Sequence, residues 1–198
     1  TAGTNVFIPA SAPQMPVING AGAVCKSITI DGTLTLQGSD TLSVNGDWSM
    51  NGTFTAASGS TVNFVGNTNA TLSGLNTSTF GKLTINKVNG YKVISSGAAF
   101  ATQNDLTISG GNLTLQAYDI DYNIGGNLSV TSSGSLTHSV NWDNQGYHSL
   151  NVLGNITMDG AFNYTTRSVV RMNGTGSKTI KSTNPFSILL MQNGNFSA

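Results

Sequence analysis

The sequence predicts an all-β protein folded as a parallel β-helix, or β-solenoid, and three observations support this prediction. Short segments alternate apolar with small polar residues, which is the period of a strand with one buried face. Turn-forming pairs such as Asn-Gly and Gly-Gly separate these segments. The pattern recurs at a spacing of roughly 21 residues, within the range typical of solenoids. With three short strands per coil, this chain would form about eight coils and a rod about 40 Å long.

The repeat is clearest in the middle of the chain. One sequence motif, two predicted strands around a turn, occurs there twice. The first copy has strands at 106–108 and 113–115 around Gly110-Gly111, and the second has strands at 128–130 and 136–138 around Ser133-Gly134. Inward apolar side chains of successive coils would stack, each contributing about 1.5–3 kcal/mol before the entropy cost. Asparagines at the corners are expected to add ladders of hydrogen bonds.

Residues 1–26 are predicted to form an N-terminal capping segment. Pro9, Pro13 and Pro16 interrupt its short apolar runs, and proline cannot donate to a strand ladder. Such a segment suits the open end of a stack of strands, where unpaired edges need a cover. Because the chain begins abruptly at Thr1, we expect it to be a piece of a longer precursor.

Residues 27–198 are predicted to form the solenoid repeats as one continuous domain. Seven apolar positions are expected to occupy one inward column, one per coil: Leu42, Val62, Leu83, Leu106, Leu128, Leu150 and Val170. The polar residues that follow them would line one outward row: Ser43, Asn63, Thr84, Thr107, Ser129 and Asn151. This assignment places the inward column and the outward row on the same strand of every coil, with their side chains on opposite sides of it.

A β-sandwich is the alternative fold, since it also combines short strands with turn signals every 8–12 residues or so. Two features favour the solenoid. Many of the alternating segments are very short, and the same phrase returns at nearly equal spacing, which a Greek key does not require. No stretch has the 3.6-residue period of a helix, and strong helix formers are scarce.

Composition argues against several classes of partner. The 198 residues carry a formal net charge of zero, only 8% are charged, and every acidic residue is Asp. A neutral surface without a basic run argues against nucleic acid, which is held mainly through its phosphates, and gives no electrostatic reason to bind an anionic membrane. No segment is apolar enough for membrane insertion. Cys25 is the single cysteine, expected to be a small buried hydrophobe.

The order of strand-like passages resembles a known family. N-V-F-I-P at residues 5–9, P-V-I at 16–18 and ITIDGTLTL at 28–36 precede GDWSMNGTFTAASGSTVNFVG at 46–66 and FGKLTINK at 80–87. This order resembles the β-helix repeat regions of large secreted surface and adhesin-like proteins of Gram-negative gliding bacteria. The resemblance implies a right-handed parallel β-helix, export, and a place in an adhesin or extracellular matrix protein. It brings no catalytic residues with it.

A candidate metal site lies in the passage D-I-D-Y-N. If Ile120 and Tyr122 point inward, Asp119, Asp121 and Asn123 share the outward face as three oxygen ligands, which suits Ca²⁺. No glycine follows where a D-x-D-x-N-G calcium loop needs one, and no Glu supplies a bidentate ligand. An ordinary polar outer face is the alternative, and no other cofactor is expected.

A candidate glycan-binding site interrupts the repeat at residues 139–148. This passage contains Trp142, Asp143, Tyr147 and His148 among amides. Sugar rings have apolar faces and many hydroxyl groups, so an aromatic, amide-rich loop on a rigid rod suits an extracellular glycan. The alternative is an insertion whose Trp142 covers the neighbouring coil.

Catalysis is disfavoured, although polysaccharide lyases and hydrolases also use the β-helix fold. A hydrolase needs a carboxylate pair at a defined separation. The candidates are Asp119 with Asp121, or Asp143 near Arg167 and Arg171. His138 is expected at an inward or corner position with a structural role, and the two histidines with one cysteine make no metal pattern.

The sequence thus predicts a non-enzymatic, extracellular structural scaffold: a repeat segment of a secreted bacterial surface adhesin or matrix fibre. Its apolar last segment, residues 186–190, has no obvious cap, so self-association through the solenoid ends into a filament is a further expectation. A glycan-binding module is the second hypothesis for its function, and a polysaccharide-degrading enzyme is the third.

Overall fold

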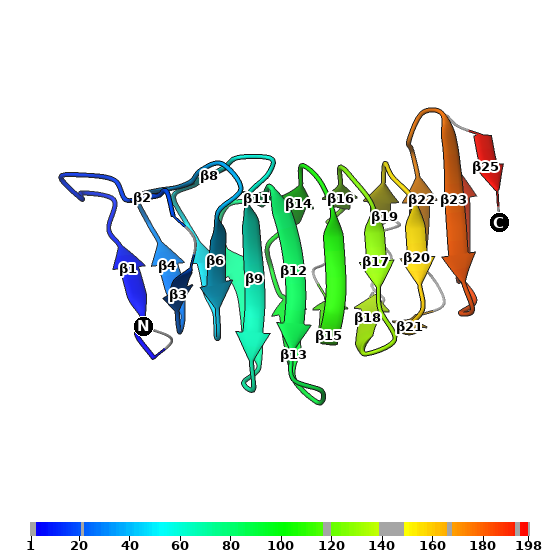
Figure 1. The fold of residues 1–198 in the computed structure, drawn as a ribbon, viewed down its shortest axis with the longest axis horizontal. Helices are drawn as coiled ribbons and strands as arrows, with labels where there is room; N and C mark the ends of the chain where they lie inside the picture. The colour runs from blue at the N-terminus through cyan, green and yellow to red at the C-terminus, as the bar shows by residue number, and fades with distance from the viewer. Residues whose placement is uncertain are drawn as a thin grey trace.

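The computed structural model shows an all-β chain whose parallel strands stack coil upon coil (Figure 1). The structure describes residues 3–20, 22–116, 120–138, 149–165, 168–192 and 195–197. About eight coils follow one another along the long axis. The predicted β-solenoid is therefore confirmed, and the facing antiparallel sheets of a β-sandwich are excluded. Within the described ranges no helix has the length and apolar character needed to span a membrane.

Each coil adds strands to three faces. The first face contains β1 (Val6–Ile8), β4 (Ile28–Ile30), β7 (Trp48–Met50), β10 (Ala70–Gly74), β13 (Lys92–Ser95), the second part of β15 (Leu106–Leu115), β18 (Gly134–His138) and β21 (Ala161–Tyr164). The second contains β2 (Val17–Ile18), β5 (Thr33–Leu36) and β8 (Thr53–Ala56), then a separate sheet of β11 (Ser78–Phe80), β14 (Phe100–Thr102), β16 (Tyr122–Ile124), β19 (Ser149–Val152), β22 (Val169–Met172) and β24 (Ile188–Met191).

The third face contains β3 (Ala23–Cys25), β6 (Thr41–Val44), β9 (Thr61–Gly66), β12 (Lys82–Lys87), the first part of β15, β17 (Leu128–Val130), β20 (Ile156–Met158), β23 (Ser177–Ser182) and β25 (Asn195–Ser197). β15 belongs to two faces because it runs through the corner between them. Its first residues pair with β12 and β17, and its last residues pair with β13 and β18.

Inward and outward columns follow from the pairing of each strand with its counterparts one coil before and one coil after. On the third face Val62 lies between Leu42 and Leu83 in the ladder. Because side chains alternate across a strand, residues of one parity all point inward and form a column. The inward columns are mostly apolar, and their apolar residues make one buried cluster that extends from Ile8 to Met172.

Large aromatic side chains occupy the centre of this cluster in successive coils. The rings of Trp48 and Phe80 have centroids 5.3 Å apart, and those of Phe100 and Tyr122 are 5.0 Å apart. Such edge and tilted contacts stabilise a core beyond the area that they bury. The indole N–H of Trp48 donates to the Ser78 hydroxyl at 2.9 Å, so its one polar atom is satisfied inside the core.

Short polar side chains connect the coils at the corner before the third face. Asp105 Oδ1 accepts the backbone N–H of Asn127 at 2.8 Å, and Asn127 Oδ1 accepts that of Asn155 at 2.8 Å. Asn155 Oδ1 in turn accepts the N–H of Thr179 at 2.9 Å. The expected corner ladder is therefore present, and two of its bonds satisfy the N–H groups of Asn127 and Asn155, which belong to no strand.

The predicted column of seven equivalent residues is correct for five of them and wrong for two. Leu42, Val62, Leu83, Leu106 and Leu128 lie on consecutive rungs of the third face. The next rung is Ile156, whereas Leu150 and Val170 pair with each other on the second face. Asn151, expected after Ser129 in the outward row, consequently lies on the second face as well.

The cause of this error is a longer coil. The contact between Asp31 and Asn51 in neighbouring coils spans 20 residues, whereas that between Asn123 and Asn151 spans 28. Extra residues between β18 and β19 lengthen that coil. A constant period, counted through this point, therefore assigns residues to the wrong face.

The predicted capping segment contributes strands to the stack. β1, β2 and β3 pair in parallel with β4, β5 and β6. Pro9, Pro13 and Pro16 all fall between β1 and β2, outside any strand, so the N–H that proline lacks is not needed for a strand ladder. Cys25 on β3 is a buried free thiol, as expected.

The aromatic run generates a stability prediction. Phe100→Ala should lower the free energy of unfolding by about 3–5 kcal/mol, because Phe100 is fully buried between rings of the neighbouring coils. Urea unfolding followed by circular dichroism measures the change. Ala101→Ser, on the outward side of the same strand, is the matched control and should change it by less than about 0.5 kcal/mol. Equal effects of the two substitutions would contradict the assignment of inward and outward sides.

Candidate functional site

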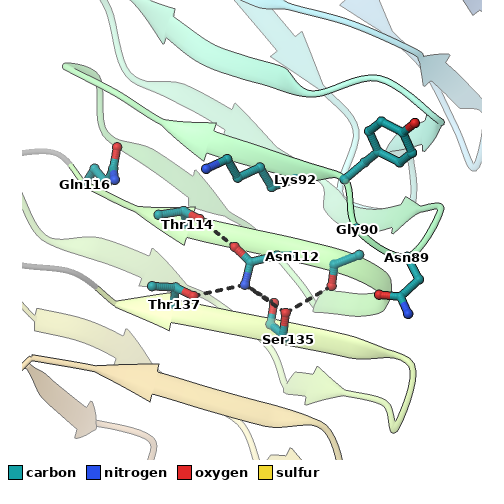
Figure 2. A pocket seen from close by; sticks show the side chains of 10 residues that line it. Asn89, Gly90, Lys92, Asn112, Thr114, Gln116, Ser135 and Thr137 are labelled. Atoms are coloured by element: carbon teal, nitrogen blue, oxygen red, sulfur yellow. Dashed lines mark hydrogen bonds between the residues drawn. The ribbon is translucent and has the colours of Figure 1, made fainter.

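A polar groove of about 400 Å³ lies on the outer side of the first face, across β13, β15 and β18 (Figure 2). Its described lining residues are mostly hydroxyl, amide and glycine residues: Asn89, Gly90, Tyr91, Lys92, Gly111, Asn112, Thr114, Gln116, Ser135 and Thr137. The volume falls within the range of about 300–1,000 Å³ that is common for small-ligand sites.

The groove exists because two successive corners differ in shape. Between β12 and β13 the chain makes a projecting turn at residues 88–91, closed by the Tyr91 N–H donating to Val88 O at 3.1 Å. One coil later β15 passes the same corner without a loop, through Gly110 and Gly111. The turn therefore overhangs a flat stretch of the next coil and forms one wall of the groove.

Gly111 permits this close approach of the two corners. Its φ of 69° lies in the left-handed region, and a Cβ atom there would come within 2.6 Å of Tyr91 O. The Asn112 N–H donates to that same carbonyl at 3.0 Å. A side chain at Gly111 would force the overhanging turn away from β15.

Asn112 is the centre of a hydrogen-bonded floor. Its amide nitrogen donates to the Ser135 hydroxyl at 2.8 Å and to the Thr137 hydroxyl at 3.0 Å (Figure 2). Its Oδ1 accepts a hydrogen bond from the Thr114 hydroxyl at 2.5 Å. Four side chains from two coils are thus fixed relative to one another, and Thr114 is 6% exposed.

The electrostatic character of the groove is close to neutral. Among its described lining residues Lys92 alone carries a charge, and no carboxylate is present. Lys92 is the ladder partner of Asn112, so its outward side chain starts beside the floor. The groove offers fixed donors and acceptors in mixture, which suits a ligand with both kinds of group.

The predicted calcium ligands are placed only in part. Asp119 lies outside the described residues. Asp121 and Asn123 are both exposed and flank the buried Tyr122, as the alternation predicts. Asp121 Oδ1 accepts the N–H of Ser149 at 2.8 Å, and Asn123 Oδ1 accepts from the side chain of the next coil, Asn151, at 2.9 Å. Both oxygens thus already bond the neighbouring coil, and Ca²⁺ binding stays a prediction.

The predicted glycan-binding residues are not placed. Trp142, Asp143, Tyr147 and His148 belong to residues 139–148, outside the described part of the chain. That prediction stays open, and the polar groove on the first face shares none of these residues.

The other candidate residues have structural contacts. His138 is inward and 1% exposed, in the ladder between Leu115 and Tyr164, so its predicted position is confirmed. Arg171 Nη1 donates to Asn151 Oδ1 at 3.4 Å, while Arg167 lies outside the described residues. Within the described ranges, no three His, Cys, Asp or Glu side chains are grouped so as to bind a metal ion.

One buried cation was not anticipated from the sequence. Lys87, at the end of β12, is 2% exposed, and its ammonium group donates to Asn45 O at 2.6 Å and to Val65 O at 2.7 Å. Burial lowers the pKa of Lys87 from 10.5 to about 8, with the Asp47 carboxylate acting in the opposite direction. Lys87 thereby connects backbone carbonyls of the two preceding coils, although its alternation with Ile85 marks it as inward.

Comparisons with protein-family models, with curated proteins and with solved structures gave no match. The groove itself could not be found by motif, since its residues come from three coils. The sequence does contain one local indication of the groove. At the corner where one coil has the Val88-Asn-Gly-Tyr91 turn, the next coil has the shorter Gly110-Gly111. Recognising it requires the register between coils, which the structure provides.

The buried lysine generates a pH prediction. The folded state has the lower lysine pKa and so binds fewer protons than the unfolded chain between about pH 8 and 10.5. The free energy of unfolding of the wild type, minus that of Lys87→Met, should therefore rise across this window, by at most about 1.4 kcal/mol per pH unit. Urea titrations at several pH values measure this difference.

The comparison with Lys87→Met removes the contribution of Cys25. Burial raises the pKa of that thiol to about 11 from 9.0, which lowers stability with rising pH equally in both proteins. A difference that is flat between pH 8 and 10.5 would contradict a buried lysine of lowered pKa.

Proposed function

We propose that this chain is a non-enzymatic, extracellular structural scaffold, a repeat segment of a bacterial surface adhesin or matrix fibre. The observation that supports it is the single apolar cluster that continues from Ile8 to Met172 through successive coils. Every coil is stabilised by its neighbours, so the length of the rod is set by the number of coils. Such a construction suits a spacer that holds parts of a larger protein at a defined separation.

The polar exterior is consistent with this role. The acidic residues are all Asp, few residues are charged, and the outward positions carry mostly Ser, Thr and Asn. A function as a polysaccharide lyase or hydrolase has less support, because the polar groove has no carboxylate among its described lining residues. The predicted carboxylate Asp121 is engaged with the backbone of the next coil.

The location generates an experiment on the producing cells. Antibodies raised against this chain should label intact, unpermeabilised cells or the matrix around them, while a cytosolic marker protein stays unlabelled. Labelling that requires permeabilisation would contradict an extracellular scaffold. Product release from a panel of polysaccharides by the purified chain would contradict its non-enzymatic character, independently of location.

We also propose that copies of this chain associate end to end. Among the described strands, β24 pairs with β22 alone, which leaves its other edge available. Met191 continues the inward column of Met172 yet is 54% exposed, and Leu190 beside it is 37% exposed. At the opposite end β1 pairs with β4 alone among the described strands, and its outward Phe7 is 62% exposed beside that edge. Each end therefore offers a strand edge with exposed apolar side chains near it to a second copy.

Light scattering at increasing concentration tests this association. The wild type should form species heavier than a monomer, and Met191→Lys should shift the chain toward monomer because it places a charge on the apolar end. Leu75→Lys is the matched control, since Leu75 is 88% exposed but lies at a corner of an inner coil. A wild type that stays monomeric, or equal effects of both substitutions, would contradict the proposal.

A further inference from the structure

We infer that the polar groove of the first face is a binding site for a neutral carbohydrate chain. The inference goes beyond a scaffold function and does not depend on it. Three properties support it: the chemistry that the groove leaves available to a ligand, the rigidity of its floor, and its extended shape.

Available hydrogen-bonding groups follow from the internal network. Asn112 uses its amide group on Ser135, Thr137 and Thr114. The Thr137 hydroxyl accepts from Asn112 and keeps its own proton for a ligand, whereas the Thr114 hydroxyl donates its proton to Asn112 and keeps acceptor capacity. Donor and acceptor thus stand side by side, on adjacent coils of the same column, because Thr114 and Thr137 are ladder partners. A sugar hydroxyl, which both donates and accepts, matches such a pair.

The floor is already in its binding conformation. Its side chains project from β15 and β18, which pair over five residues from Gly111 to Leu115. Because the strands and the Asn112 network fix these side chains, a ligand orders few additional rotatable bonds when it binds. This matters for carbohydrates, whose individual hydrogen bonds give small net gains in water.

The shape of the groove suits a chain more than a compact molecule. Asn89 and Gly90 lie at one end, Gln116 lies at the other, and the Asn112 floor lies between them (Figure 2). A ligand would therefore run along β15, with amide side chains at both ends. Tyr91 is also a lining residue, and among the described lining residues it is the one with an aromatic ring, the kind of group that packs on the apolar face of a sugar.

Other classes of ligand fit less well. An anionic ligand needs several cationic groups, and Lys92 is the one charge among the described lining residues. A cation needs carboxylates, which that lining lacks. An apolar ligand would leave Asn112, Thr114 and Thr137 without water or partners for their remaining hydrogen-bonding capacity.

The test is an array of immobilised neutral oligosaccharides, including glucans, mannans, galactans and oligomers of N-acetylglucosamine, probed with the labelled full chain. The strongest binder is then titrated into isotope-labelled protein and followed by NMR. We expect saturable binding, with shift changes concentrated in residues 89–92, 112–116 and 135–137. This mapping uses the wild type and does not depend on how any variant folds.

Two variants and one control complete the design. Thr137→Val removes the hydroxyl and should weaken binding by about threefold to tenfold, and Tyr91→Leu removes the ring and should weaken it by about fivefold or more. Thr107→Val makes the same change on the third-face part of β15, where Thr107 is an outward ladder partner of Thr84, and should leave the affinity unchanged. Circular dichroism and thermal melting establish that each variant is folded.

Several outcomes would overturn the inference. These are the absence of any neutral binder on the array, affinity that is unaffected by both Thr137→Val and Tyr91→Leu, and shift changes confined to residues 139–148. Binding restricted to sulfated or uronic-acid glycans and abolished by salt would also overturn it, because that would indicate recognition of charge.

Discussion

The structure depends on one constraint: every strand pairs in parallel with its counterpart one coil away. Backbone hydrogen bonds then run between coils, and equivalent residues are held on top of one another. An inward position that is apolar in one coil is therefore covered by an inward position of the next, and the core becomes a continuous column. The aromatic run from Trp48 to Tyr122 is a direct consequence, since rings of successive coils are brought to centroid distances suited to edge and tilted contacts.

Corners impose a second requirement, because backbone groups there leave the strand ladder. Asp105, Asn127 and Asn155 meet it with Oδ1 atoms that accept N–H groups of the next coil. The short Asp side chain reaches backbone N–H groups of the next coil, as it also does at Asp47 and Asp121. Lys87 satisfies backbone acceptors instead of donors, since its ammonium group donates to carbonyls of two earlier coils. These polar residues therefore connect one coil with another.

Irregular corners are where such a fold can acquire a site. A regular stack presents flat faces, so a hollow requires successive coils to differ. Here a projecting turn at residues 88–91 stands beside the flat Gly110-Gly111 corner, and the difference between them forms the polar groove. The groove leaves the buried column untouched, because its floor consists of outward side chains such as Asn112 and Thr137. The proposed scaffold and the proposed carbohydrate site can accordingly occupy the same coils, because the groove uses outward side chains and the core uses inward ones.

The sequence by itself determined the fold class, the short strands, the five inward residues of one column from Leu42 to Leu128, and the exposed positions of Asp121 and Asn123. These follow from alternation and turn pairs, which are local properties of the chain. It could not determine the face of Leu150 and Val170, since a longer coil breaks the count and only the ladder restores it. The carbonyl partners of Lys87 and the groove around Asn112 were likewise decided by tertiary structure. Both depend on which corner stands above which, and that depends on contacts between residues more than twenty positions apart along the chain.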